Sequence, residues 1–247
     1  MQTRFLSFGR PLDAEGRRRK FRRALDTAQR VGAHHFVLSG DLTEVGTPGE
    51  YETLAEVLHD SGIRPERFTL VPGNHDLYSS ANGWRWALEG PLAAFARTSA
   101  GESGKVVDVG GVSLLPIDAT FHQPVTRSAG CIADGGLEAI ERRAADPAFA
   151  GRPLIVVQHH PPFVRRTSAW QWMDGLINAA HMMSILETFR HLFVLHGHLH
   201  AIVDRALGCG VRRILGATAI VDDGDAPRVR LYDIREGRLE SAGLVVG

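Results

Sequence analysis

Residues 68–76, with the sequence FTLVPGNHD, decide the fold prediction, because an apolar run ends there in a tight polar cluster. A continuous apolar run of this length, bounded by turn residues, is typical of a strand that is covered on both faces. The same order of apolar run and polar cluster occurs at residues 36–41 (FVLSGD), 154–162 (LIVVQHHPP) and 192–200 (LFVLHGHLH). Four buried strands that each end in polar residues predict an α/β fold.

The four polar clusters are expected to meet at one edge of the predicted sheet. In open α/β sheets a ligand site lies outside the carboxyl ends of the strands. The side chains at these ends are Asp, Asn and His, and carboxylate, amide oxygen and imidazole are ligands of divalent metal ions. The sequence therefore predicts a metal site that is built from four strand ends.

The composition indicates an ordinary globular chain. Its 247 residues are enough for one large α/β domain, and we expect a single domain over residues 1–247. Twenty-eight basic residues balance 28 acidic ones, so no net field favours nucleic acid or an anionic membrane as a partner. The two cysteines, Cys131 and Cys209, form no paired motif, and no signal peptide or membrane-spanning run is evident. These features predict a cytoplasmic protein without nucleic-acid or membrane partners.

Hydrophobic periodicity predicts the remaining elements. The helix over residues 47–60 has the clearest start, because Thr47, Pro48 and Glu50 match a capping box. Further helices are expected over residues 14–31, 84–97, 135–146 and 181–190. Further strands are expected at residues 3–7, as a pair within 105–118, and in the tail at 211–216, 228–234 and 241–246. The tail strands alternate poorly with helices, so partly antiparallel pairing is expected, and residues 163–180 have no clear assignment.

The four motifs together resemble the calcineurin-like metallophosphoesterase superfamily. Gly-Asp, Gly-Asn-His-Asp, His-His-Pro-Pro and Gly-His-Leu-His follow one another in that family's order, between residues 36 and 200. Each motif alone is a weak signal, but the four in order are specific. The resemblance implies an α/β/β/α sandwich, in which two mixed β-sheets are flanked by helices. It also implies a hydrolase that acts on phosphoric esters.

The resemblance implies metal-binding roles one residue at a time. Asp41 corresponds to the carboxylate that bridges two metal ions. Asn74, His159 and His198 correspond to ligands of the second metal, and His200 corresponds to a ligand of the first. The mixed nitrogen and oxygen ligands, without sulfur, suit manganese, iron or zinc.

Two further residues match the catalytic positions of the family. His75 corresponds to the histidine that faces the phosphate and assists the leaving group, and Asp76 corresponds to its orienting partner. Two cations roughly 3.5–4 Å apart can clamp a phosphoryl group and lower the pKa of a bound water towards about 7. The expected reaction is attack of a metal-bound hydroxide on a small phosphodiester or phosphomonoester, with a proton or hydrogen bond from His75.

The sequence departs from the family at its first motif. The family opens with Asp-x-His at the end of its first strand, and both residues bind the first metal. Here residues 4–10 read RFLSFGR, and the nearest acid, Asp13, is a poor substitute by position. The first metal would keep only Asp41 and His200, so we expect the second site to be occupied and the first to be weak or empty. A natural deletion, an engineered one and a different start region all remain open.

Two other functions compete with hydrolysis. The missing motif favours a phosphate-binding protein of the same fold that hydrolyses its ligand weakly or not at all. A nuclease ranks lower, because neither an accessory DNA-binding domain nor a basic stripe is evident. Within the enzyme hypothesis, the loops at residues 77–90, 119–134 and 163–180 should set specificity. The habit of the family favours a homodimer.

Several other residues are interpreted as structural. His160 and His196 flank motif histidines and are expected to support them, while Asp118 fits a site or a structural role equally well. Surface roles are expected for Arg127, Arg165, Arg166 and for His34, His35, His59, His122, His181 and His191. Core or dimer positions are expected for Trp84, Trp86, Trp170 and Trp172.

Overall fold

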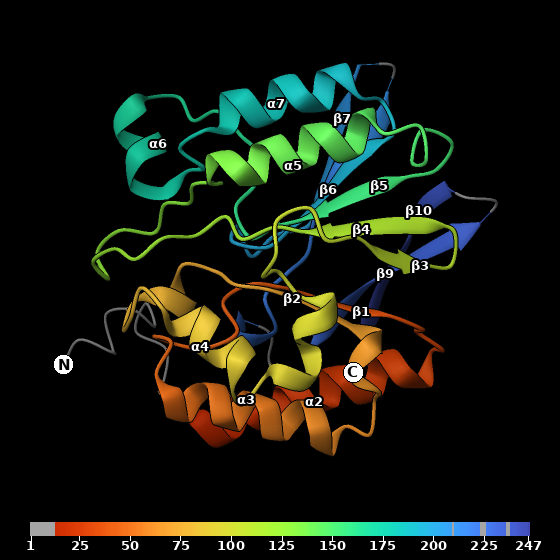
Figure 1. Ribbon diagram of the computed structural model, residues 1–247. Coiled ribbons are helices and arrows are strands. Elements are labelled where there is room, and N and C mark those ends of the chain that lie inside the picture. The colour runs from red at the N-terminus through yellow and green to blue at the C-terminus, as the bar shows by residue number, and fades with distance from the viewer. Residues whose placement is uncertain (1–12, 209, 223–225, 236–237) are drawn as a thin grey trace.

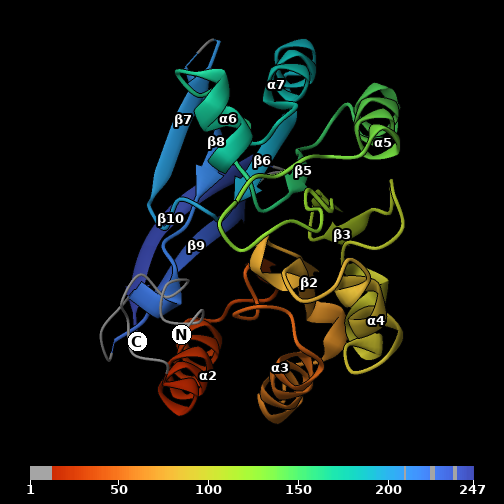
Figure 2. The same cartoon turned by 90° about the vertical axis from the view of Figure 1, so that its left-hand side faces the viewer.

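The chain folds into layers of strands that are enclosed by helices on two sides. The structure is a computed structural model that describes residues 13–208, 210–222, 226–235 and 238–247. Helices α5, α6 and α7 cover one side and helices α2, α3 and α4 cover the other, with the strands between them (Figure 1). The view turned by 90° shows the same separation of the two helical groups (Figure 2). The expected mixed α/β architecture with flanking helices is confirmed.

The larger sheet has six strands in the order β3-β4-β5-β6-β8-β7. Strands β4, β5, β6 and β8 run parallel, while β3 and β7 pair antiparallel at the two edges. The strands are β3 (Val107–Val109), β4 (Val112–Pro116), β5 (Leu154–Val157), β6 (Leu192–His196), β7 (Val203–Leu207) and β8 (Val211–Gly216). The helices on this side are α5 (Asp134–Ala145), α6 (Ser168–Asp174) and α7 (Ala179–Thr188).

The second layer of strands consists of two separate pairs among the residues that the structure describes. Strand β1 (Phe36–Ser39) runs parallel to β2 (Phe68–Val71), and β9 (Arg228–Arg235) runs antiparallel to β10 (Arg238–Val246). The helices on this side are α2 (Ala14–Arg30), α3 (Pro48–Asp60) and α4 (Gly83–Glu89). Four short 3₁₀ helices are η1 (Pro65–Arg67), η2 (His75–Leu77), η3 (Ala93–Thr98) and η4 (Ile220–Asp222).

Continuous apolar sequence explains the central strands. Every residue of β2 and of β5 is buried, as expected for strands that are covered on both faces. Between the layers, side chains of the large sheet such as Ile155 and Leu195 pack with Val71 of β2 and with Tyr232 and Ile234 of β9. The polar residues that follow β2, β5 and β6 are therefore carried on largely buried strands, whereas in β1 only Phe36 is buried.

Most of the expected elements occur within one or two residues of their predicted bounds. The capping box at Thr47 and Glu50 is present, because the Glu50 carboxylate accepts hydrogen bonds from Thr47 N and Thr47 Oγ1, at 2.8 and 2.9 Å. The antiparallel pairing expected in the tail is also confirmed, since β7 pairs with β8 and β9 pairs with β10. The strand expected at residues 3–7 lies outside the described residues.

One expectation about secondary structure is wrong, and two further elements lie where no element was expected. The single helix expected over residues 84–97 is divided into α4 and η3. Residues Gly90 and Pro91 lie at the break, and proline has no N–H to continue the helical hydrogen bonds. Helix α6 and strand β7 were not expected, because none of the residues of α6 is buried and four of the five residues of β7 are incompletely buried, so neither shows a clear apolar face.

No helix within the described residues combines the length and the apolar character that crossing a membrane requires.

Phe68 is expected to be a main determinant of stability on the β1–β2 side. Its ring is fully buried and lies 5.4 Å from the ring of Phe36 and 5.6 Å from that of Phe95, measured between centroids. Phe68→Ala should lower the free energy of unfolding by about 3–5 kcal/mol, measured by urea denaturation, because it leaves a cavity. Trp170→Ala is the control: this ring is 63% exposed, so its loss should change the value by about 0.5 kcal/mol or less. Equal effects of the two substitutions would contradict this assignment of the core.

Candidate functional site

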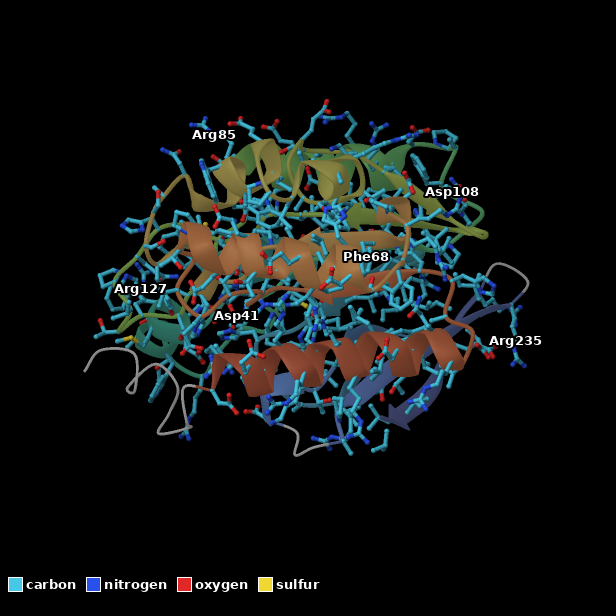
Figure 3. All side chains as sticks on the ribbon, turned by 90° about the horizontal axis from the view of Figure 1, so that it is seen from below. Asp41, Phe68, Arg85, Asp108, Arg127 and Arg235 are labelled. Carbon is cyan, nitrogen blue, oxygen red and sulfur yellow. The ribbon has the colours of Figure 1, made fainter. Side chains whose placement is uncertain are left out.

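Six of the seven residues expected at the site line one cavity. They come from the ends of β1, β2, β5 and β6, and they are Asp41, Asn74, His75, His159, His198 and His200. The cavity has a volume of about 1510 Å³ and extends from these residues between α2 and β9. Figure 3 shows Asp41 on the same side of the molecule as Arg127, away from Asp108 and Arg235. The seventh residue, Asp76, is fully buried and does not line the cavity.

Three of these residues have an unusual backbone conformation. The φ angles of Asp41, His198 and His200 are 52°, 61° and 52°. They are the only residues other than glycine with positive φ among those that the structure describes. Such a conformation is uncommon for a residue with a side chain, and it persists where the surrounding structure enforces it, often at functional sites. All three follow strand ends, so the turn directs each side chain into the cavity instead of continuing the strand.

Asp41 and His159 face each other across the two layers of strands. The His159 Nε2 atom lies 3.2 Å from Asp41 Oδ2, and the ring is 2% exposed. On the other side of the ring, Nδ1 donates a hydrogen bond to the Ser39 carbonyl at 2.7 Å. Because Nδ1 carries the hydrogen, neutral His159 presents the lone pair of Nε2 to the carboxylate. Two electron-pair donors at this distance need a proton or a metal cation between them.

The pKa values of Asp41 and His159 also indicate that positive charge is favourable between them. Burial alone would raise the pKa of Asp41, but His159 and the neighbouring His75 hold it below its usual range. Burial opposes the charged form of His159, but Asp41 raises the pKa of that imidazole above its ordinary value. The arrangement therefore favours a cation at this position.

Asn74 offers a free oxygen in the same region. Its side chain is 1% exposed, and its Nδ2 donates to Tyr78 Oη at 2.7 Å. Tyr78 Oη in turn donates to the Arg127 carbonyl at 3.0 Å, which fixes the orientation of the amide. The Asn74 Oδ1 atom is buried and has no hydrogen-bond partner among the described residues. A buried oxygen without a partner is costly, and a bound divalent ion would satisfy it.

Three imidazoles gather beside Asp41. The rings of His159, His160 and His198 lie 4.4–5.2 Å apart between centroids, and one nitrogen of each lies within 4.8 Å of the others. His160 Nε2 is paired with the Ser128 carbonyl at 2.8 Å, and burial lowers the pKa of His160 well below its usual value. His160 thus stays neutral and packs against the other two rings. His196 is also neutral, because burial lowers its pKa to about 4.

The remaining ring contacts orient His75 and His200. The Nδ1 atom of His75 lies 2.8 Å from the Glu44 carbonyl, and its backbone N donates to Asp41 Oδ1 at 3.1 Å. The Nδ1 atom of His200 lies 2.5 Å from Asp222 Oδ2. In each ring Nδ1 is held by an oxygen acceptor, which fixes the orientation of the ring.

The carboxylate of Asp76 contacts backbone groups and a threonine hydroxyl. Its carboxylate accepts hydrogen bonds from the backbone N–H groups of Gly73, Leu42 and Thr43, at 2.7, 3.1 and 2.8 Å, and from Thr43 Oγ1 at 2.7 Å. Among the described residues, the hydrogen bonds of this carboxylate go to these groups and not to the ring of His75, so the orienting role of Asp76 stays a prediction. Asp76 ties the loop after β1 to the loop after β2.

Sequence reasoning did not identify Asp174, which contacts a motif histidine. The Nε2 atom of His198 lies 2.9 Å from Asp174 Oδ1 and 3.1 Å from the carbonyl oxygen of the same residue. Asp174 ends α6, inside the segment that showed no clear pattern. Of the arginines in the loops, Arg165 pairs with Asp174 at 2.8 Å, and Arg127 lies between the rings of Phe121 and Trp172. No signal in the sequence indicated these partners.

Three of the remaining histidines have hydrogen-bond partners outside the site. His35, His122 and His181 pair with Thr69 Oγ1, with the Leu77 carbonyl and with Glu141, respectively. Asp118 accepts hydrogen bonds from the backbone N–H and the hydroxyl of Thr120, at 2.9 and 2.5 Å, and is not part of the cavity lining. These contacts favour the structural interpretation of Asp118.

Comparison with known proteins shows one consistent family. The profile of a family described as calcineurin-like phosphoesterase matches residues 13–201. Over 167 residues, the chain is 29% identical to a probable cyclic nucleotide phosphodiesterase of Rhodopseudomonas palustris. The matched region covers 66% of this chain and 56% of that protein. A glycerophosphodiester phosphodiesterase of Enterobacter lignolyticus is 26% identical over 167 residues, or 66% of this chain and 55% of that protein. The chain thus spans about half the length of these two relatives.

A solved structure shares the fold at much lower identity. A dimetal phosphatase from Danio rerio superposes with a TM-score of 0.54 at 10% identity. The superposition covers 93% of this chain and 88% of the other. This likeness shows that the two chains have the same fold.

Gly40 is expected to be indispensable for the contact between Asp41 and His159. Its φ is +98°, and a Cβ atom there would lie 2.2 Å from His159 Nδ1. Gly40→Ala should therefore displace the His159 ring and lower both stability and metal affinity. Gly32→Ala is a matched control, because Gly32 has a φ of +81° and open space around its Cα. It should cost about 1–2 kcal/mol in urea denaturation and leave metal affinity unchanged. The account of the site is contradicted if Gly40→Ala binds metal as tightly as Gly32→Ala does.

Proposed function

The chain belongs to the calcineurin-like phosphoesterase family, and from this premise we propose that it hydrolyses a small phosphate ester with the help of a divalent metal ion. The observation that carries the proposal is the close pair of Asp41 Oδ2 and His159 Nε2, which lie 3.2 Å apart in the lining of the cavity. The unpartnered Asn74 Oδ1 supports it, because a neutral amide oxygen adds a ligand without adding negative charge.

One set of four residues would hold the ion. These are Asp41, Asn74, His159 and His198, which offer two oxygens and two nitrogens. Asp41 and His200 would contribute to a second, weaker position. When bound, a divalent ion supplies Lewis-acid chemistry that polarises a phosphoryl oxygen and lowers the pKa of water. The donor set suits manganese, iron or zinc.

His75 would act on the leaving group. The Glu44 carbonyl holds its Nδ1, and the ring packs against Tyr78 with centroids 5.0 Å apart, so the ring has a fixed orientation. The hydrogen on Nδ1 would make Nε2 of the neutral ring an acceptor, while the protonated ring can donate from Nε2 to a departing oxygen. An imidazole suits this role because it can both accept and donate a proton.

A small phosphodiester is the proposed substrate. The relatives from Rhodopseudomonas palustris and Enterobacter lignolyticus are named as phosphodiesterases of cyclic nucleotides and of glycerophosphodiesters. Both named substrates contain a phosphodiester bond, but the groups that this bond joins are different. Phosphomonoesters stay within the proposal, because the cluster of donors recognises the phosphoryl group itself.

A second candidate is a protein of this fold that binds phosphate without hydrolysing it. In the family that the sequence resembles, an Asp-x-His motif binds the first metal. Residues 4–10 lack this motif, which favours this alternative. One ion still provides polarisation, but it cannot clamp the phosphoryl group from two sides. The two candidates differ in turnover and not in metal binding.

Hydrolysis should depend on a divalent metal and on His75. The protein should hydrolyse bis(p-nitrophenyl) phosphate with added manganese and lose this activity with a chelator. On a substrate with an alkoxide leaving group, such as a glycerophosphodiester, His75→Ala should lower kcat about 10²–10⁴-fold with little change in metal affinity, because it removes the proton donor and no expected ligand. His122→Ala is the matched control, since His122 also pairs with a backbone carbonyl but does not line the cavity. Metal binding without turnover would favour the phosphate-binding alternative, and turnover that is indifferent to chelator would contradict both candidates.

The number of tightly bound ions should be one per chain. By the resemblance, Asp41, Asn74, His159 and His198 would hold one ion, whereas among the described residues Asp41 and His200 would hold the other. Elemental analysis after dialysis against metal-free buffer should find one equivalent of manganese, iron or zinc. Two tightly held equivalents per chain would refute the proposed inequality of the two positions.

A further inference from the structure

The ring of His198 is held from outside the four sequence motifs. Its Nε2 atom lies 2.9 Å from Asp174 Oδ1 and 3.1 Å from the Asp174 carbonyl oxygen. Both atoms are acceptors, so Nε2 must carry a hydrogen. The only other nitrogen of the ring that can bind a cation is then Nδ1. Asp174 therefore determines which nitrogen His198 offers to the cavity.

Both oxygens of the Asp174 carboxylate accept hydrogen bonds from protein donors. Its Oδ1 atom also accepts from Ser128 Oγ at 3.0 Å, and its Oδ2 atom accepts from Arg165 at 2.8 Å. Although burial would raise the pKa of Asp174, His198 and these donors hold it below the usual value. A carboxylate whose two oxygens both accept from protein donors is suited to holding the ring of His198 in place.

Further hydrogen bonds join the segment around Asp174 to the loop at residues 119–134. Ser128 N donates to the Met173 carbonyl at 3.0 Å, and the Ser128 carbonyl pairs with His160 Nε2 at 2.8 Å. Gly130 and Leu176 form a parallel bridge close by. The position of Asp174 is therefore set by the loop at residues 119–134 as well as by α6, although no residue of α6 is buried.

We propose that Asp174 is a positioning residue for the metal centre, acting by holding His198 through Nε2 so that Nδ1 faces the ion. This inference rests on the proposed metal-dependent function. It follows a general pattern, because a histidine that binds a metal usually donates its other N–H to a carboxylate or carbonyl, and loss of that partner weakens metal binding. His159 shows the same pattern with the Ser39 carbonyl.

The first test measures manganese affinity by competition with a chromogenic chelator. Asp174→Ala should weaken binding about 10–100-fold. Asp174→Asn keeps an oxygen that can accept from Nε2, so it should recover part of the loss. Asp108→Ala is the matched control, because Asp108 also pairs with an arginine, Arg152, but does not line the cavity. Figure 3 shows Asp108 and Arg127 at opposite ends of the molecule. This control should bind manganese as the unchanged protein does.

The second test asks whether Asp174 acts through His198. In a double-mutant cycle, Asp174→Ala should cause no further loss of affinity once His198→Ala is present, whereas a direct metal ligand would cause an additional loss. Urea denaturation of each metal-free variant checks that it folds.

The outcomes separate this inference from the function on which it rests. If the unchanged protein binds manganese and Asp174→Ala binds it equally well, the positioning role is wrong and the proposed function stands. A loss of affinity that persists in the His198→Ala background also overturns the positioning role. If the unchanged protein binds no divalent metal, both the inference and the proposed function fail.

Discussion

Two electron-pair donors that face each other, Asp41 Oδ2 and His159 Nε2, impose the constraint on which the rest of the site depends. They lie 3.2 Å apart, and the Ser39 carbonyl holds the hydrogen of the imidazole on the far nitrogen. In a region of low dielectric, two such groups repel each other unless a positive charge lies between them. The left-handed backbone of Asp41 and the absence of a side chain at Gly40 make the close approach sterically feasible. The fold thus maintains a contact that is favourable only when a cation or a proton is present.

The surrounding hydrogen bonds hold the four histidine rings of the site in the same manner. His75, His159, His198 and His200 each have one nitrogen held by an oxygen, and that oxygen belongs to Glu44, Ser39, Asp174 and Asp222, respectively. Two of these acceptors are backbone carbonyls, so the rings are oriented by the strand ends and turns themselves. Asp76 contributes differently, because it joins the loops after β1 and β2 through four hydrogen bonds. A bound ion would therefore meet rings that are already oriented, which reduces the entropy lost on binding.

The sequence predicted those parts of the molecule that local pattern determines. Buried strands such as β2 and β5 are continuous apolar runs, and their bounds were predicted correctly. The break between α4 and η3 was missed because the apolar spacing continues across Gly90 and Pro91, although proline interrupts the hydrogen bonds. Contacts between distant segments could not be predicted. Asp174 is 24 residues from His198 and lies in a short helix without an apolar face, so only the folded structure brings the two together.

The central claim is that four residues from four strand ends share one divalent ion, and anomalous diffraction tests it most directly. Crystals soaked in manganese would be measured at the manganese absorption edge. The account predicts one strong anomalous peak within about 2.0–2.3 Å of an Asp41 oxygen, Asn74 Oδ1, His159 Nε2 and a nitrogen of His198. The absence of a peak near Asp41 and His159 in crystals in which these residues are well ordered would contradict it. A single strong peak elsewhere in the protein would contradict it as well.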